Sequence, residues 1–250
     1  MKTQKERYEK LYEFNGFRWL FRFDVHYRCK RMHEKLKDLS LSVDAKRVMD
    51  FGFGNAAMLK TFPKSCSIVG MDVSKSALEN AKHNDELLQY ADCKFVLIDE
   101  TKIPYCDDEF DYIISSHSLE HTIDDEATLD FFYEKLAKNG YLLLFVPVEE
   151  PDYIRYHSYT YSLPSIQNKC KKAGFHIVFA EGSMHINGHI WKLLTIPSRR
   201  EWPVLSKCVD GFRLLSLSLL PYSIIKRCDC FLDKLAFSPR QAFVIAKKNA

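Results

Sequence analysis

Short apolar runs alternate with segments of helical character through the middle of the chain. The predicted strands are the runs at 47–51, 67–72, 94–98, 112–116 and 141–146. The predicted helices between them are at 56–61, 75–88 and 126–137. Strands separated by helices are joined by right-handed crossovers, which place helices on both faces of a mostly parallel sheet. The pattern therefore predicts a doubly wound, Rossmann-like α/β fold.

The pattern continues with one further helix and two further strands. The helix is predicted at 163–173, before Gly174, and the strands at 176–180 and 242–246. No internal repeat or Pro/Gly-rich linker marks a second domain. Because 250 residues with 46% hydrophobic content can bury one substantial core, we expect a single domain spanning residues 1–250.

Two segments fall outside the core pattern and are predicted to form a lid. Residues 1–44 are amphipathic and predicted to be helical. Residues 182–239 form an insertion before the last strand, and they also have helical, hydrophobic character. The core is thus expected at 45–181, with the last strand inside 240–250.

Charge and cysteine content bear on the partners and location of the protein. Residues 1–47 hold 13 Lys/Arg against 7 Asp/Glu, which makes either a solvated helix face or an arm that attracts an anionic partner.

The apolar run at 212–225 is interrupted by Ser216, Ser218 and Pro221, and it falls short of the ~20 residues that span a membrane. Eight cysteines without paired C-x-x-C spacing, and no secretory signal, favour reduced thiols and a cytoplasmic location.

A glycine-containing turn follows the first strand. Asp50 lies near the end of that strand, and Gly52, Gly54 and Asn55 lie in the turn. Glycine lets the backbone turn sharply and lets a ligand approach without a Cβ in the way. A nucleoside is therefore expected on this turn, although dinucleotide-binding enzymes use a similar one.

Acidic residues follow the next two strands. Asp72 ends the second strand, where Rossmann-type sites hold a ribose diol, and Asp99 ends the third. Because the carboxyl ends of parallel strands meet at one edge, these residues, Asp50 and the turn at 115–117 are expected to converge on one crevice. Asp50 would repel a pyrophosphate, so the set favours a ligand with an ammonium group and one adenine over a dinucleotide.

With these residues the chain resembles the class I S-adenosylmethionine-dependent methyltransferases, in particular the small-molecule group that includes the O-methyltransferases of ubiquinone biosynthesis. The matching stretches are VMDFGFGNA at 48–56, VGMDVS at 69–74, VLIDETKIPYCDDEFDYIISSHSLEHTID at 96–124 and LAKNGYLLLFVP at 136–147. The resemblance covers roughly 48–181 and the last strand, and leaves both lid segments unmatched. It implies a seven-stranded sheet whose last strand is antiparallel.

The resemblance also implies how S-adenosylmethionine is held, with S-adenosylhomocysteine as the product. Asp50 and the backbone of the two glycines would contact the methionine part, Asp72 the ribose hydroxyls, and Asp99 the adenine amino group. Ala56 stands where the family has its third glycine. The full set of predicted cofactor contacts is Asp50, Gly52, Gly54, Asn55, Asp72, Val73, Asp99, Glu100, Ser116 and His117.

Methyl transfer requires alignment of the acceptor with the sulfonium, and a base where the acceptor holds its proton tightly. His121 belongs to the motif Leu119-Glu120-His121, which recurs in the resembling family and opens the helix after the fourth strand. It is predicted either to be the base or to be a structural hydrogen-bonding residue. His117 and His157 are the other catalytic candidates. The predicted acceptor contacts are Tyr12, Arg155, Tyr156 and His185.

The identity of the acceptor stays open at this stage. We expect oxygen methylation of a small organic molecule, including a lipid-like or carrier-bound one; the alternatives are N-methylation, or cofactor binding without transfer. Nucleic-acid bases are disfavoured because 115–118 reads Ser-Ser-His-Ser in place of D/N-P-P-Y/F. No metal site is predicted. His185 and His189 could bind a metal together if they shared one face of a helix, but Gly182 and Gly188 weaken a helix there. The oligomeric state is left undecided.

Overall fold

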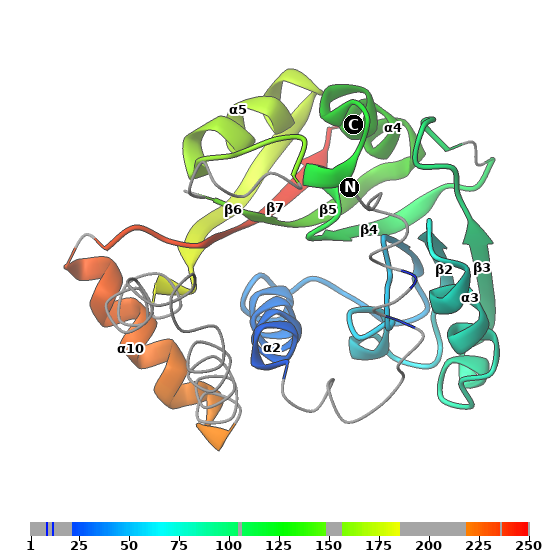
Figure 1. Cartoon of the computed structure of the whole chain (residues 1–250), viewed down its shortest axis with the longest axis horizontal. Coiled ribbons are helices and arrows are strands. Elements are labelled where there is room, and N and C mark those ends of the chain that lie inside the picture. Colours follow the sequence, from blue (N-terminus) through cyan, green and yellow to red (C-terminus); the bar gives the residue numbers. More distant parts are fainter. Residues whose placement is uncertain are drawn as a thin grey trace, which may run out of the picture.

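The computed structural model describes residues 9, 12, 22–104, 107–148, 157–185, 219–235 and 237–249. A seven-stranded sheet forms its centre, with the order β3-β2-β1-β4-β5-β7-β6 (Figure 1). The strands are β1 (Arg47–Phe51), β2 (Ser67–Asp72), β3 (Asp92–Leu97), β4 (Phe110–Ser116), β5 (Leu136–Pro147), β6 (Phe175–Ser183) and β7 (Gln241–Lys248).

Six of these seven strands run in one direction. β1 pairs in parallel with β2 and β4, β2 with β3, and β4 with β5. β7 lies between β5 and β6 and is antiparallel to both. The predicted doubly wound, mostly parallel sheet with an antiparallel last strand is therefore confirmed.

Helices lie on both sides of the sheet. The α-helices of the described residues are α2 (Phe23–Asp38), α3 (Lys75–Lys82), α4 (Asp125–Lys135), α5 (Leu163–Lys172) and α10 (Tyr222–Lys234). Short 3₁₀ turns are η2 (Leu59–Thr61), η3 (Leu87–Gln89) and η4 (Leu119–His121). None of the described helices is both long enough and apolar enough to cross a membrane.

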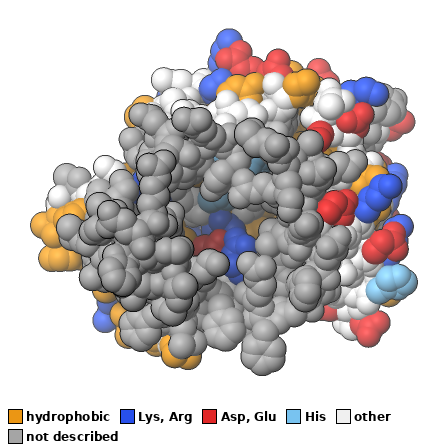
Figure 2. Space-filling view, in the orientation of Figure 1, with side chains coloured by type: hydrophobic (Ala, Val, Ile, Leu, Met, Phe, Trp, Pro, Cys, Tyr) orange, Lys and Arg blue, Asp and Glu red, His pale blue; other side chains and the backbone are white. Residues whose placement is uncertain are grey.

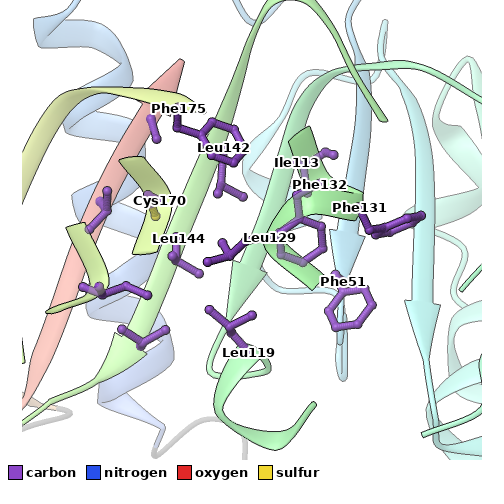
Figure 3. Packing of buried hydrophobic residues seen from close by; sticks show 14 of the residues in the cluster. Phe51, Ile113, Leu119, Leu129, Phe131, Phe132, Leu142, Leu144, Cys170 and Phe175 are labelled. Carbon is purple, nitrogen blue, oxygen red and sulfur yellow. The ribbon is translucent and has the colours of Figure 1, made fainter. Parts of the chain in front are cut away.

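The core is divided into two apolar clusters by the sheet. On one face, Leu129 and Phe132 of α4 and Cys170 of α5 pack with Phe51 and Leu144 of the strands (Figure 3). The cluster on the other face includes apolar residues of α2 and α3 and of the loop after β1. Strands that are buried on both faces carry nearly continuous apolar runs, which is why the runs located them well in the sequence.

Two predicted helices are wrong in extent. The segment 56–61 forms only a turn and η2, because Ala56 has a φ of 58° and therefore does not continue into an α-helix. The helix predicted at 75–88 ends at Lys82; the Asn84 side chain then accepts hydrogen bonds from the N–H groups of Glu86 and Leu87, and η3 follows. Asn stabilises such turns by bonding to the backbone that follows it.

The described parts of the two predicted lid segments contact each other through α2 and α10. The Tyr27 hydroxyl donates to Asp229 at 2.9 Å, and the Tyr222 hydroxyl donates to Glu34 at 2.8 Å. The Arg31 guanidinium of α2 forms a bidentate ion pair with Glu181 of β6. These contacts connect α2 to α10 and to the sheet.

Candidate functional site

The turn after β1 brings the backbone close to other groups, as glycine allows. Gly52 and Gly54 have φ values of 75° and 55°, a region that favours glycine. A Cβ at Gly52 would lie 2.0 Å from Ser118 Oγ, and one at Gly54 would lie 2.3 Å from the Tyr12 hydroxyl oxygen. The Gly52 N–H donates to the Met71 carbonyl at 2.7 Å, which joins the turn to the end of β2.

Two buried carboxyl groups, those of Asp50 and Asp72, interact electrostatically next to this turn. Asp50 is 1% exposed, and neither of its carboxyl oxygens has a hydrogen-bond partner among the described residues. Burial raises the pKa of Asp50 well above its usual range, and the Asp72 carboxylate raises it further. Asp72 accepts hydrogen bonds from the N–H groups of Gly54 and Ser74, both at 2.9 Å, while burial raises its pKa as well. A cationic ligand would relieve the repulsion between them.

Glu9 and Tyr12, the two described residues before Arg22, reach this end of the site. The Glu9 carboxylate accepts from the N–H groups of Lys75 and Ser76 at the start of α3, where an anion is favoured. The Asn80 amide donates to the Tyr12 carbonyl at 2.9 Å, and the Tyr12 phenol lies over Gly54. Burial, followed by the Asp72 carboxylate, raises the pKa of Tyr12 above its usual range.

The segment after β3 forms an open edge of the site. Asp99 lies two residues beyond the last residue of β3, Leu97, so it follows the strand and does not end it. Its carboxylate accepts from the Thr101 N–H at 3.0 Å and from the Thr101 hydroxyl at 2.8 Å, and these bonds lower the pKa of Asp99.

The end of β4 turns back on the sheet at His117. This residue has a φ of 57°, and its N–H donates to the Phe145 carbonyl at 2.9 Å. Its Nε2 lies 3.0 Å from Gln241 Oε1. Burial, and then the Arg28 guanidinium, lowers the pKa of His117 well below its usual range. The imidazole is therefore neutral near pH 7.

A carboxylate and two further imidazoles lie together beyond this turn. The Glu120 side chain is fully buried, and its Oε1 is 3.9 Å from His121 Nε2 and 3.7 Å from His117 Nδ1. The His121 ring packs edge-on against the His157 ring, with centroids 4.7 Å apart. Glu120 and His121 lie in the 3₁₀ turn η4, so the helix predicted to open there begins instead at Asp125.

One pocket of about 350 Å³ joins all these groups. Figure 2 shows acidic, basic and histidine side chains near the centre of this view of the molecule. All ten residues predicted to contact the cofactor line the pocket: Asp50, Gly52, Gly54, Asn55, Asp72, Val73, Asp99, Glu100, Ser116 and His117. Tyr12, His121 and His157 line it too.

Three predicted acceptor contacts do not form part of the described pocket. Arg155 and Tyr156 lie outside the described residues. His185 is 1% exposed and packs against the second lid segment: its Nδ1 is 2.6 Å from the Phe237 carbonyl oxygen, and its N–H donates to Asp229 of α10 at 2.6 Å. His185 is thus held against the second lid segment and is not among the described residues that line the pocket, so its contact with the acceptor stays a prediction.

Two arginines at and after the start of α2 line the pocket and were not predicted from the sequence. Arg22 and Arg28 both line the pocket, and they share the Asp24 carboxylate, at 2.8 Å from Arg22 Nη2 and 3.5 Å from Arg28 Nη2. The Arg28 side chain is 7% exposed, and its Nε has no hydrogen-bond partner among the described residues. Asp24 and Arg28 are four residues apart on a predicted helix, so their ion pair could have been predicted from the sequence. The same spacing does not indicate which side of the helix faces the pocket.

Residues 42–194 match a family model described as a methyltransferase domain. No curated protein matches the chain in sequence. A solved structure of the [4+2]-cyclase SpnF has 16% identity and a TM-score of 0.57, over 88% of this chain and 80% of that one. A putative methyltransferase from Bacillus halodurans has 16% identity and a TM-score of 0.56, over 87% and 99% of the two chains.

A third similar structure is phosphoethanolamine N-methyltransferase 2 from Haemonchus contortus, in complex with phosphomonomethylethanolamine and S-adenosylhomocysteine. It has 18% identity and a TM-score of 0.56, over 88% of this chain and 53% of that one, so this chain spans about half its length. Identities this low establish a shared fold and leave the substrate undefined.

Proposed function

The chain belongs to the methyltransferase-domain family, and from that membership we propose that it methylates an oxygen atom, of a hydroxyl or carboxyl group, on a small organic acceptor. S-adenosylmethionine is its methyl donor. The observation that carries the proposal is the single pocket that joins the glycine turn and its two buried carboxyl groups to Glu120, His121 and His157.

The glycine end of the pocket fits S-adenosylmethionine. Asp50 presents two buried oxygens without a hydrogen-bond partner among the described residues, and an ammonium group would satisfy both hydrogen bonding and charge there. A side chain at Gly52 or Gly54 would clash with Ser118 or Tyr12, so the turn needs glycine at both positions. We assign the methionine part to Asp50 and this turn, the ribose to Asp72, and the adenine to the edge at Asp99.

The other end of the pocket fits an acceptor that carries a proton on oxygen. The bound donor supplies an electrophilic methyl carbon; the new C–O bond replaces the C–S bond, whose electrons remain on sulfur, and the acceptor proton must leave. His121 and His157 line the pocket at this end, and imidazole is the side chain best suited to accept a proton near neutral pH. We therefore place the acceptor hydroxyl against these two residues.

Calorimetry with S-adenosylhomocysteine tests the donor half. Loss of a charge-assisted hydrogen bond costs about 1.5–3 kcal/mol, so Asp72→Ala should bind on the order of 10- to 150-fold more weakly than the wild type. Asp130→Asn, an exposed acid on α4, is the matched control and should bind as the wild type does. Equal affinities for wild type and Asp72→Ala would reject the assignment of Asp72.

Turnover tests the acceptor half. Candidate acceptors come from mass spectrometry of molecules that co-purify with the protein and from a panel of small alcohols, phenols, carboxylic acids and amines. We expect S-adenosylhomocysteine production with an oxygen acceptor, and on the order of 10²–10⁴-fold less with His121→Ala if proton removal limits the rate. Products methylated only on nitrogen, or tight donor binding with no turnover on any acceptor, would contradict oxygen methylation.

A further inference from the structure

The acceptor end of the pocket holds three side chains whose chemistry is that of metal ligands. Glu120, His121 and His157 each offer one oxygen or nitrogen atom, and these atoms all lie within 4.8 Å of one another. Ligand atoms around a metal ion with bonds of about 2.0–2.2 Å lie closer together than this, so only small side-chain rotations separate the present arrangement from a ligating one.

The backbone holds these residues together across a long stretch of chain. Glu120 and His121 are neighbours in η4, whereas His157 follows the fifth strand. The Ser158 N–H donates to the Glu120 carbonyl at 2.8 Å, which fixes the residue next to His157 against η4. The three side chains are therefore brought together by main-chain structure, and a ligand site built on them would be largely pre-formed.

The surroundings of the cluster match those of a reactive centre more closely than those of a surface site. The Glu120 side chain is fully buried and that of His121 is 13% exposed, yet all three residues line the pocket. His117 adds a contact behind the carboxylate: its Nδ1 lies 3.7 Å from Glu120 Oε1 while its Nε2 lies 3.0 Å from Gln241 Oε1. At 3.7 Å the contact between His117 and Glu120 is close but longer than a hydrogen bond.

We propose that Glu120, His121 and His157 bind one divalent transition-metal ion, of the Zn²⁺, Co²⁺ or Mn²⁺ class, whose open coordination positions face the acceptor oxygen. Two imidazoles and one carboxylate suit such ions, and three protein ligands leave room for water or substrate. This inference rests on the proposed function, because the metal would act on the oxygen that receives the methyl group.

The metal would change how the acceptor loses its proton. An oxygen bound to a divalent ion ionises at lower pH, as bound water does. The acceptor O–H would then release its proton to water on coordination, and the oxygen lone pair would form the C–O bond as the C–S bond breaks. His121 and His157 would act as ligands in this case, and an acceptor with two neighbouring oxygens could chelate the ion.

No metal site was predicted because metal ligands are recognised in a sequence by their short spacing. His185 and His189 offered a local pair, whereas His121 and His157 are far apart in the chain and meet only through the fold. Their joint presence with a buried carboxylate at one end of the pocket is visible in the structure alone.

Metal binding by the full chain, prepared without an affinity tag, tests the proposal directly. The chain is stripped with a chelator and titrated with Co²⁺ alone, and the visible absorption of bound Co²⁺ is recorded, followed by displacement with Zn²⁺. We expect one Co²⁺ per chain, with nitrogen and oxygen ligation. His157→Ala and Glu120→Gln should each weaken binding by at least about tenfold, because each removes a ligand.

Controls separate loss of the site from loss of the fold. His176→Ala removes an exposed histidine of β6 and should bind Co²⁺ as the wild type does. Each variant is also titrated with S-adenosylhomocysteine, whose binding should be retained when the fold is intact; if Glu120→Gln does not fold, His157→Asn provides the second ligand variant.

Two results would overturn the proposal: no stoichiometric Co²⁺ binding by the wild type, or the same binding by the wild type and a folded ligand variant. Either result would leave the donor assignment and oxygen methylation standing, with His121 or His157 as the base. Failure of the proposed function would be seen separately, as Co²⁺ binding at these residues in a chain that transfers no methyl group to oxygen.

Discussion

Asp50 should destabilise the protein in the absence of its cofactor, and Asp50→Asn should reverse this. The side chain is buried without a hydrogen-bond partner among the described residues, and its pKa is raised first by burial and then by Asp72. An acid whose pKa is higher in the folded than in the unfolded state does not lower the free energy of unfolding at low pH. As the pH rises through the folded-state pKa, ionisation of the buried acid lowers that free energy.

The size of the effect follows from the cost of burying an unsatisfied polar group, about 1–3 kcal/mol or more for a charged one. Wild type and Asp50→Asn should therefore have similar stability at about pH 4, below or near the unfolded value. At about pH 8 the variant should be more stable by at least about 1 kcal/mol, which for a chain of this size raises the melting temperature by roughly 2–4 °C per kcal/mol.

Cofactor affinity should change in the opposite direction. An ionised Asp50 paired with the donor's ammonium group contributes about 1.5–3 kcal/mol, so Asp50→Asn should bind S-adenosylhomocysteine on the order of 10- to 150-fold more weakly. Thermal unfolding across the pH range and calorimetry provide the two measurements, with Asp130→Asn as the acid control. Parallel stability curves for wild type and Asp50→Asn, together with unchanged affinity, would refute the reasoning.

Three further substitutions test other parts of the structure. Gly52→Ala should lower both melting temperature and S-adenosylhomocysteine affinity, since its φ of 75° costs an L-residue about 1–2 kcal/mol and its Cβ would lie 2.0 Å from Ser118 Oγ; an unchanged melting temperature would contradict this. Phe132→Ala should cost about 3–5 kcal/mol in urea unfolding because Phe132 is fully buried between α4 and the sheet, and a loss below 1 kcal/mol would be inconsistent with that packing. Tyr27→Phe should cost about 1 kcal/mol by removing the hydrogen bond to Asp229, without changing affinity for S-adenosylhomocysteine.

The sheet was predictable because its central strands are buried on both faces. Strands β1, β2 and β4 carry continuous apolar runs with turn residues after them, and their predicted positions differ from the observed ones by at most two residues at either end. β5 begins at Leu136. It was predicted to start at 141 because Lys138, Asn139 and Gly140 have the composition of a turn. Local composition located the strands, but pairing with β4 decides where β5 begins.

The donor side of the site was predictable for a different reason. Asp50, Asp72 and Asp99 each lie at, near or just after the carboxyl end of a parallel strand, so sequence position alone placed them at one edge. The acceptor side depends on contacts between segments far apart in the chain. Arg28 faces the pocket only because α2 packs across it, and His157 meets His121 only because Ser158 bonds to η4.

This division has a consequence for how specificity is set. Asp50 and Asp72 belong to β1 and β2 of the sheet, whereas Arg28 belongs to α2 and Arg22 directly precedes that helix. The helix is connected to β6 through Arg31 and to α10 through Tyr27. Substitutions on the pocket side of α2 should therefore change the charge in the pocket while the sheet, the glycine turn and the two donor acids stay in place. Under the proposed assignment, the choice of acceptor could therefore vary with the pocket side of α2 while Asp50, Asp72 and the glycine turn are retained.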